Sequence, residues 1–168
     1  GMSSYAAFLE SKTLTPQAAG LSDVPALASH LFQFQSEAVA FGLRAGSWGC
    51  FFDTGLGKTA CELEWCQHAL EATNGRALIL TPLAVAGQTK RRADRWGYEA
   101  RVIRDQSQAG PGINICNYDR LDKLDPSQFG AASLDEASIL KSLSSTYARC
   151  ATTGRRLRPS LLLLTHTL

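Results

Sequence analysis

The residues with the clearest chemistry lie at 53–59, where small and polar side chains have the spacing of a phosphate-binding loop. Gly55 and Gly57 allow the backbone to turn tightly, so that successive N–H groups can point at phosphate oxygens. Lys58 would place a positive charge near the β- and γ-phosphates of a nucleotide, and the Thr59 hydroxyl suits Mg²⁺. The general pattern G-x-x-x-x-G-K-[ST] has glycine where Phe52 stands. A glycine-rich turn with a solvated lysine is the alternative interpretation.

The flanking segments fit a nucleotide site. Apolar residues 48–52 predict a buried strand before the loop, and residues 59–70 predict a helix with Leu63, Cys66 and Leu70 on one face. A bound anion would then lie at a helix N-terminus, where backbone N–H groups favour negative charge. The loop therefore predicts ATP and Mg²⁺ as cofactors. The residues expected to bind them here are Thr54, Gly55, Leu56, Gly57, Lys58 and Thr59.

Strands and helices alternate along the rest of the chain. Thr81 is expected to cap a helix that has Pro82 at its first position and runs to about Trp96. The alternation predicts an α/β domain with a mainly parallel sheet. Further strands are predicted at 76–80, 100–104, 113–116, 131–134 and 161–164, and further helices at 5–12, 35–44 and around Leu140, Leu143 and Tyr147.

An acidic pair, Asp135 and Glu136, follows the predicted strand at 131–134. In an open parallel sheet, ligands gather at the carboxyl ends of the strands, and this pair falls at such an end, as does the phosphate-binding loop. Asp135 could hold Mg²⁺ through water, and Glu136 could orient or deprotonate the attacking water. Acidic residues also favour helix N-termini for electrostatic reasons alone, so the pair indicates catalysis only in combination with the loop.

The composition excludes several other classes of protein. The chain has 168 residues, and 45% of them are hydrophobic, as expected for one globular domain. Its net charge of +2 gives no argument for nucleic-acid binding from bulk charge. Five scattered cysteines without a C-x-x-C pair favour buried, reduced thiols over disulfides or a zinc site. No apolar run could span a membrane and no signal peptide is evident, so we expect a cytoplasmic protein.

Together these motifs resemble superfamily 2 helicases, and more closely the Swi/Snf-type, DEAD-like ATPases and the helicase-like proteins of phages. Residues 55–59 (G-L-G-K-T) resemble motif I, and residues 134–141 (L-D-E-A-S-I-L-K) resemble motif II. Residues 31–35 resemble the glutamine motif, and residues 80–85 resemble motif Ia. Residues 115–121 resemble a segment near motif Ib, and residues 164–167 resemble motif III. His166 stands at a position that is usually small in motif III. The likeness runs from about residue 31 to the end.

The resemblance implies a three-layer RecA-like P-loop NTPase domain at residues 31–168, after an N-terminal extension at 1–30. It also implies that Gln35 reads adenine, that Lys58, Asp135 and Glu136 are catalytic, and that Thr59 and Asp135 hold the metal. Family members carry a second RecA-like domain with motifs IV to VI, whose arginines complete the ATP site. The expected function is therefore that of the ATP-binding domain of a DNA helicase or translocase, inactive without a second domain or partner chain.

Other functions stay open. The chain could be a remnant that binds nucleic acid or a partner protein without hydrolysing ATP. RNA is as compatible with the sequence as DNA. A P-loop kinase or GTPase fits less well, because no N-K-x-D guanine motif is present and the Gln35 motif fits helicases.

Basic residues after motif Ia are candidates for nucleic-acid binding. In the family this region faces the nucleic-acid backbone, although a solvated helix face would have the same composition. The cluster comprises Lys90, Arg91, Arg92 and Arg95, and a second cluster comprises Arg155, Arg156 and Arg158. His30 and Phe32 could stack on adenine, but a core position for Phe32 is equally compatible. The tryptophans Trp48, Trp65 and Trp96 are expected in the core.

Overall fold

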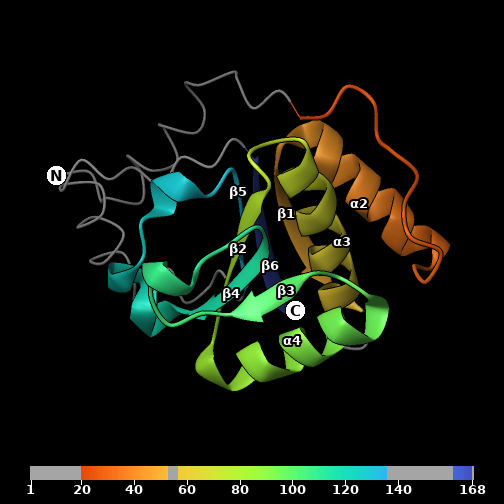
Figure 1. The fold of residues 1–168 in the computed structure, drawn as a ribbon. Helices are drawn as coiled ribbons and strands as arrows, with labels where there is room; N and C mark the ends of the chain where they lie inside the picture. The colour runs from red at the N-terminus through yellow and green to blue at the C-terminus, as the bar shows by residue number, and fades with distance from the viewer. Residues whose placement is uncertain (1–19, 53–56, 136–160, 168) are drawn as a thin grey trace, which may run out of the picture.

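A computed structural model describes residues 20–52, 57–135 and 161–167 of the chain, and six strands in these residues form one sheet (Figure 1). The strands lie in the order β1-β6-β5-β2-β4-β3, and every neighbouring pair is parallel. Their carboxyl ends therefore meet at one edge of the sheet. The strands are β1 (Ser47–Phe52), β2 (Arg76–Thr81), β3 (Ala100–Val102), β4 (Gly112–Asn117), β5 (Ala131–Leu134) and β6 (Leu161–Thr167).

Helices and short 3₁₀ turns cover the sheet on both faces. Helix α3 (Lys58–Glu71) packs against β2, β4 and β5, and α4 (Leu83–Trp96) packs against β3 and β4. Helix α2 (Gln33–Ala45) packs against α3 and β1. The 3₁₀ helices are η2 (Gln106–Gln108), η3 (Tyr118–Lys123) and η4 (Pro126–Gln128). The expected three-layer α/β architecture with a parallel sheet is confirmed.

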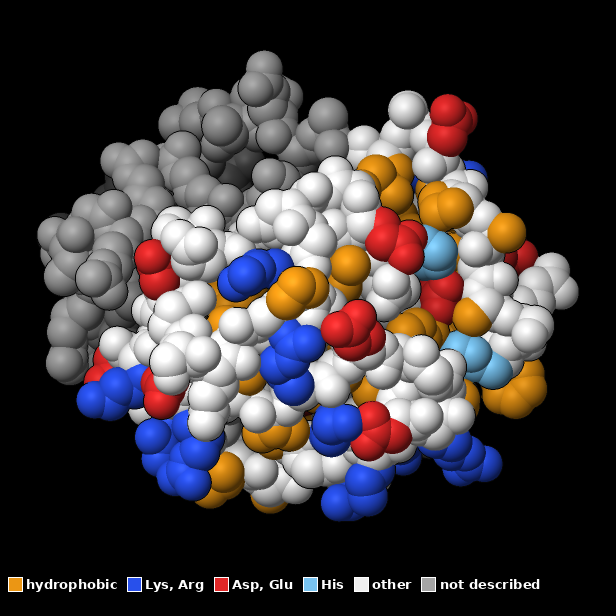
Figure 2. Space-filling model, in the orientation of Figure 1, with side chains coloured by type: hydrophobic (Ala, Val, Ile, Leu, Met, Phe, Trp, Pro, Cys, Tyr) orange, Lys and Arg blue, Asp and Glu red, His pale blue; other side chains and the backbone are white. Residues whose placement is uncertain are grey.

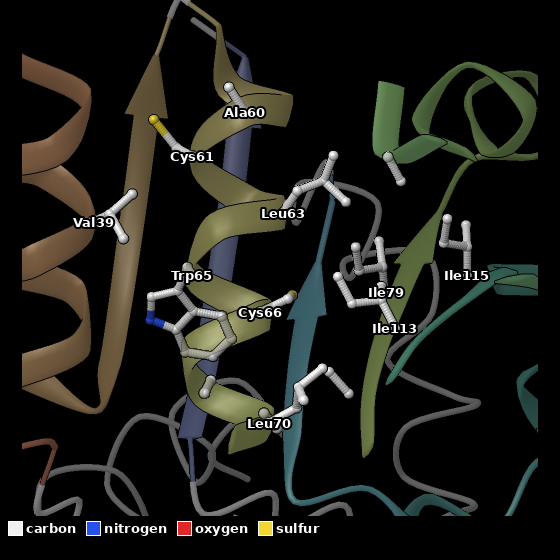
Figure 3. Packing of buried hydrophobic residues seen from close by; sticks show 14 of the residues in the cluster. Val39, Ala60, Cys61, Leu63, Trp65, Cys66, Leu70, Ile79, Ile113 and Ile115 are labelled. Carbon is white, nitrogen blue, oxygen red and sulfur yellow. The ribbon is translucent and has the colours of Figure 1, made fainter. Parts of the chain in front are cut away.

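The sheet separates two hydrophobic cores. Successive side chains of a strand point to opposite faces, so Ala77 and Ile79 of β2 pack against the helices, whereas Leu78 and Leu80 pack against the segment that contains η3. Figure 3 shows the core on the helical face, where Trp65 of α3 is fully buried. Because both faces are covered, the strands read as nearly continuous apolar runs, which is the pattern of a buried parallel sheet.

The helix predicted at 35–44 corresponds to α2, the one at 59–70 to α3, and each predicted strand overlaps an observed one. The strand expected at 100–104 is shorter, since β3 ends at Val102. One local prediction was wrong. Thr81 does not cap α4: it is the last residue of β2, and Pro82 holds the N-cap position. Helices expected at 5–12 and around Leu140, Leu143 and Tyr147 lie outside the described residues.

Residues 20–31 pack against the domain ahead of α2. The amide of Leu21 donates to the carbonyl of Leu43 at 2.8 Å, and the side chains of Leu21, Val24 and Leu27 pack against the helical-face core. His30 stacks on Trp96 with ring centroids 4.9 Å apart, which joins this segment to the end of α4. These contacts fix the chain that leads into the glutamine motif.

Three of the five cysteines lie among the residues whose side chains the structure describes. Cys61, Cys66 and Cys116 are buried and none of the three is in a disulfide, and burial raises the pKa of the Cys116 thiol to about 11. Within residues 20–52, 57–135 and 161–167, no three His, Cys, Asp or Glu side chains are grouped to hold a metal by themselves. No helix among these residues is long and apolar enough to cross a membrane.

Candidate functional site

Helix α3 begins directly after the segment predicted to be a phosphate-binding loop, with Gly57 at its N-cap position and Lys58 as its first residue. Gly57 has φ 76° and ψ 38°, a left-handed conformation that glycine adopts without strain. A Cβ atom at this position would lie 2.2 Å from Nε2 of Gln35. The positive φ favours glycine here, and the short distance shows that the side chain of Gln35 on α2 lies against the start of α3. Residues 53–56, with Thr54, Gly55 and Leu56, lie outside the described part of the chain.

Lys58 pairs with Asp135 at the carboxyl edge of the sheet. Its Nζ atom lies 2.8 Å from Oδ1 of Asp135, and the side chains are only 12% and 4% exposed. Strand β5 ends at Leu134, so Asp135 is the first residue beyond the strand. The structure thus brings together two residues that the sequence separates widely and that were predicted to act at one site.

Every polar group of Asp135 has a partner. Thr81 Oγ1 donates to Oδ2 at 3.0 Å, and the hydroxyl of Tyr118 donates to the backbone carbonyl of Asp135 at 2.5 Å. The Asp135 amide donates to the carbonyl of Leu80 at 2.8 Å. Strand β2, helix η3 and helix α3 therefore all hold this one residue, which fixes its carboxylate at the sheet edge. This also explains the wrong capping prediction, since the Thr81 hydroxyl is turned towards a buried carboxylate.

A second carboxyl group, that of Glu62, lies one helical turn along α3 from Lys58. Glu62 of α3 is 2% exposed, and its Oε2 accepts a hydrogen bond from Oγ of Ser133, on β5, at 2.6 Å. Burial, together with the negative charge of Asp135, raises the pKa of Glu62 from 4.5 to about 8. Glu62 is therefore largely neutral at pH 7.

Gln35 lies beside Gly57, in the first turn of α2, and is 4% exposed. Its Oε1 accepts a hydrogen bond from the amide of Phe32 at 2.9 Å, which closes the N-terminus of the helix. Phe32 itself is 69% exposed and stacks with Phe34, with ring centroids 6.2 Å apart. The alternative core position of Phe32 is therefore wrong. His30, the other candidate for adenine stacking, is already stacked on Trp96.

The predicted basic cluster lies on α4 but does not form one patch. Lys90 pairs with Asp94 one turn further along the helix, and Arg92 is only partly exposed. Arg91 and Arg95 are exposed and four residues apart, so they share one helical face. Lys and Arg side chains gather on the side of the molecule where α4 lies (Figure 2). The second cluster, at 155–158, lies outside the described residues, as does Glu136.

A polar network between α3 and the segment before α2 was not predicted. Glu64 is 3% exposed and accepts hydrogen bonds from the Ala28 amide at 3.0 Å, from the Tyr98 hydroxyl and from His68 Nε2 at 2.6 Å. Burial alone would raise the pKa of Glu64, but these hydrogen bonds outweigh it and lower that pKa. The hydrogen bond to Glu64 raises the pKa of His68. The network fastens residues 28–30 to the domain.

Comparison with known proteins identifies the fold. The sequence matches no known family model and no curated protein. The structure is similar to the Sulfolobus solfataricus SWI2/SNF2 ATPase core in complex with dsDNA, with a TM-score of 0.66 and 16% identity over 84% of this chain. It is also similar to the UvsW helicase from bacteriophage T4, with a TM-score of 0.62 and 19% identity over 97% of this chain.

The chain shares the fold of these two proteins. The resemblance drawn from the motifs is thereby confirmed at the level of the fold. The matches cover only 33% of the SWI2/SNF2 core and 60% of UvsW, so the chain spans part of each larger protein. At these identities the likeness extends to architecture, and the chemistry has to be argued from the site.

Proposed function

We propose that this domain binds Mg-ATP at the carboxyl edge of its sheet and serves as the first RecA-like domain of a nucleic-acid-dependent helicase or translocase. The observation that carries the proposal is the buried pair of Lys58 and Asp135, 2.8 Å apart, at the N-terminus of α3. A helix N-terminus with a lysine and a carboxylate at a strand end is the arrangement that phosphates and Mg²⁺ require.

The donor set fits Mg²⁺ together with a nucleotide. The Asp135 carboxylate and the Thr59 hydroxyl are hard oxygen ligands of the kind Mg²⁺ prefers. Bound Mg²⁺ would neutralise charge that develops on the phosphates. Lys58 would exchange Asp135 for the β- and γ-phosphates, and the backbone N–H groups of residues 54–59 would surround them. Glu136, next to Asp135 in sequence, would orient or deprotonate the attacking water.

The base of the nucleotide would lie near Gln35. A glutamine amide can pair with N6 and N7 of adenine, donating through its nitrogen and accepting through its oxygen. Gln35 Nε2 faces Gly57, so the amide lies beside the loop that would hold the phosphates. The exposed ring of Phe32 supplies an aromatic surface next to it. These positions support adenine as the preferred base.

Nucleic acid is the proposed second ligand. The SWI2/SNF2 core with the similar fold was solved in complex with dsDNA. On this chain, Arg91 and Arg95 on the exposed face of α4 are the candidates for contacts with phosphates, and Lys90 and Arg92 would contribute less. One domain provides only part of such a binding track, so we expect modest affinity. DNA and RNA are both compatible.

Turnover is proposed to require a second RecA-like domain or a partner chain. An arginine supplied across the cleft is worth about 10³–10⁵ in rate in phosphoryl-transfer enzymes. Residues 1–168 alone should therefore hydrolyse ATP near the background rate and should not separate strands. A rate of about 1 s⁻¹ that depends on Glu136 and rises with DNA would contradict this. A domain that binds nucleotide and nucleic acid or a partner protein without turnover is the second candidate function, and it shares the nucleotide site.

Calorimetric titration with Mg-ATP tests the proposal. Lys58→Ala removes the charge that faces the phosphates and should weaken binding about tenfold or more, which corresponds to about 1.4 kcal/mol. Lys123→Ala, at an exposed position of η3, is the matched control and should bind like the wild type. Circular dichroism of each variant shows whether the fold is retained. Equal affinity of the wild type and a folded Lys58→Ala variant would reject the site.

A further inference from the structure

Two side-chain contacts join α3 to β5 and the residue that follows it, one helical turn apart along α3. Lys58 and Glu62 are four residues apart on α3 and therefore lie on one helical face. Asp135 and Ser133 are two residues apart along β5 and its continuation, so they point to the same side of the sheet. Lys58 meets Asp135 at 2.8 Å and Glu62 meets Ser133 at 2.6 Å. The contact between Glu62 and Ser133, called the lower contact below, is buried in the core.

A carboxyl group in this place is unfavourable for stability alone. Glu62 is 2% exposed and Ser133 is fully buried, and apolar side chains of similar volume would avoid the cost of desolvating them. The pKa of Glu62, raised to about 8 by burial and by Asp135, leaves the group uncharged at pH 7. A neutral acid can hydrogen-bond to Ser133 without competing with Asp135 for the ammonium group of Lys58.

We propose that Glu62 is a positioning residue of the nucleotide site: its hydrogen bond to Ser133 fixes α3 against β5 and so sets the separation of Lys58 and Asp135. The inference rests on the proposed Mg-ATP site. Lys58 is the first residue of its helix and Asp135 the first beyond its strand, so a contact one turn below is the nearest place where the two elements can be held in register. Displacements of about 1 Å at such sites can cost about 10²-fold in rate.

Stability and positioning can be separated experimentally, because both partners of the lower contact can be made apolar together. Glu62→Leu combined with Ser133→Ala leaves no buried polar group without a partner, so the thermal midpoint should stay equal or rise. Glu62→Gln keeps the shape and the hydrogen bond to Ser133 but cannot ionise. A purely structural role predicts that any variant with the wild-type midpoint also binds Mg-ATP like the wild type.

The experiment measures Mg-ATP affinity by calorimetry and the thermal midpoint for the wild type, Glu62→Gln and the double variant. Glu71→Leu, at the exposed end of the same helix, is the matched control. We expect about tenfold weaker Mg-ATP binding by the double variant, with Glu62→Gln and Glu71→Leu close to the wild type. The loss should be smaller for ATP measured with a chelator, because Asp135 then has no metal to hold.

Two outcomes overturn the inference. One is a folded double variant that binds Mg-ATP as tightly as the wild type, and the other is Glu62→Gln binding as weakly as the double variant. If the double variant does not fold, Ser133→Ala alone decides, since it removes the same hydrogen bond from β5, and its binding like the wild type would reject the inference. Failure of the proposed function gives a different result, namely a wild-type protein that does not bind Mg-ATP.

Discussion

Thr81 and Asp135 are joined across two adjacent strands, with the hydroxyl of Thr81 donating to the carboxylate at 3.0 Å. Both residues are buried, so their hydrogen bond is largely shielded from water. This contact connects the strand before α4, which carries the candidate nucleic-acid residues, to the residue proposed to hold Mg²⁺.

Replacing this hydroxyl should destabilise the domain. Thr81→Val keeps the shape of the side chain but leaves Oδ2 of a buried carboxylate without its hydroxyl donor, which should lower the free energy of unfolding by about 1–3 kcal/mol. Urea denaturation measures it. Thr89→Val is the control, because the Thr89 hydroxyl bonds only to a carbonyl within α4. Equal effects of the two substitutions would contradict the importance of the Asp135 contact.

Glu62 should make stability fall as the pH rises. Its pKa is about 8 in the folded protein and about 4.5 when unfolded, so between these values the folded state keeps a proton that the unfolded state has released. The free energy of unfolding should then decrease with pH, by at most about 1.4 kcal/mol per pH unit from this group. Glu62→Gln removes the slope, so its advantage over the wild type should grow from about pH 4.5 to about pH 8. A constant difference would contradict the raised pKa.

The pair of Glu64 and His68 should contribute to folding stability in a different pH range. The raised pKa of His68 means that its contribution is fully present below the unfolded value of 6.5 and is lost as the pH rises through the folded value. The lowered pKa of Glu64 means that its contribution is lost as the pH falls through that value. His68→Gln should therefore cost most stability in mildly acidic solution. Thermal melts at about pH 5.5 and about pH 9 test this, and equal losses at both would contradict it.

Arg91 and Arg95 should dominate binding of single-stranded DNA. Reversing both charges to Glu should weaken binding similarly for all sequences and reduce the dependence of log affinity on log salt by about 1 for each lost contact. Arg76→Glu, at the amino end of β2 and hence the opposite edge of the sheet, is the control. Binding that ignores both salt and the α4 substitutions would favour a solvated helix face. Fluorescence anisotropy at several salt concentrations measures these effects.

Gln35 should determine the preference for adenine. Gln35→Glu keeps the oxygen that accepts from the Phe32 amide but removes the nitrogen donor, so the helix end should persist while the ratio of ATP to GTP affinity falls about fivefold or more. Gln33→Ala, exposed on the same turn, should leave the ratio unchanged. Titration of both nucleotides gives the ratio. An unchanged ratio in Gln35→Glu would reject base recognition by this residue.

The helices, the strands and the pairing of Lys58 with Asp135 at one site could be predicted from the sequence, because they follow from local periodicity and from where the strands end. Lys58 and Asp135 could be assigned to one site because residues at the carboxyl ends of parallel strands meet at one edge. The hydrogen bond from Thr81 to Asp135 could not be predicted, because Asp135 is remote in sequence. A helix cap is also a sufficient local explanation for a Thr-Pro pair. Glu62 was missed for a related reason. A glutamate beside Leu63 resembles an exposed helix position, whereas α3 is buried on nearly all sides.

Aromatic residues before Gln35 could not be distinguished from the sequence either. His30 and Phe32 both lie a few residues before the glutamine, but the ring of Trp96 stacks on His30 only in the folded chain. Phe32 is left exposed on the other side. Which aromatic ring is available depends on a contact between distant segments, and no short sequence pattern indicates it.

The spacing of Glu62 from Lys58 and of Ser133 from Asp135 is a sequence signal from which the second contact between α3 and β5 could have been predicted.

The contacts of residues 20–31 decide where a shortened version of this protein can begin. Starting expression at Leu31, the first residue of the glutamine motif, would remove Leu21, Val24 and Leu27 from the core and the Ala28 amide from Glu64. The exposed apolar surface of α2 and α3 would then promote aggregation. Starting at Gly20 keeps these contacts, so it is the shorter boundary to choose for crystallisation or calorimetry.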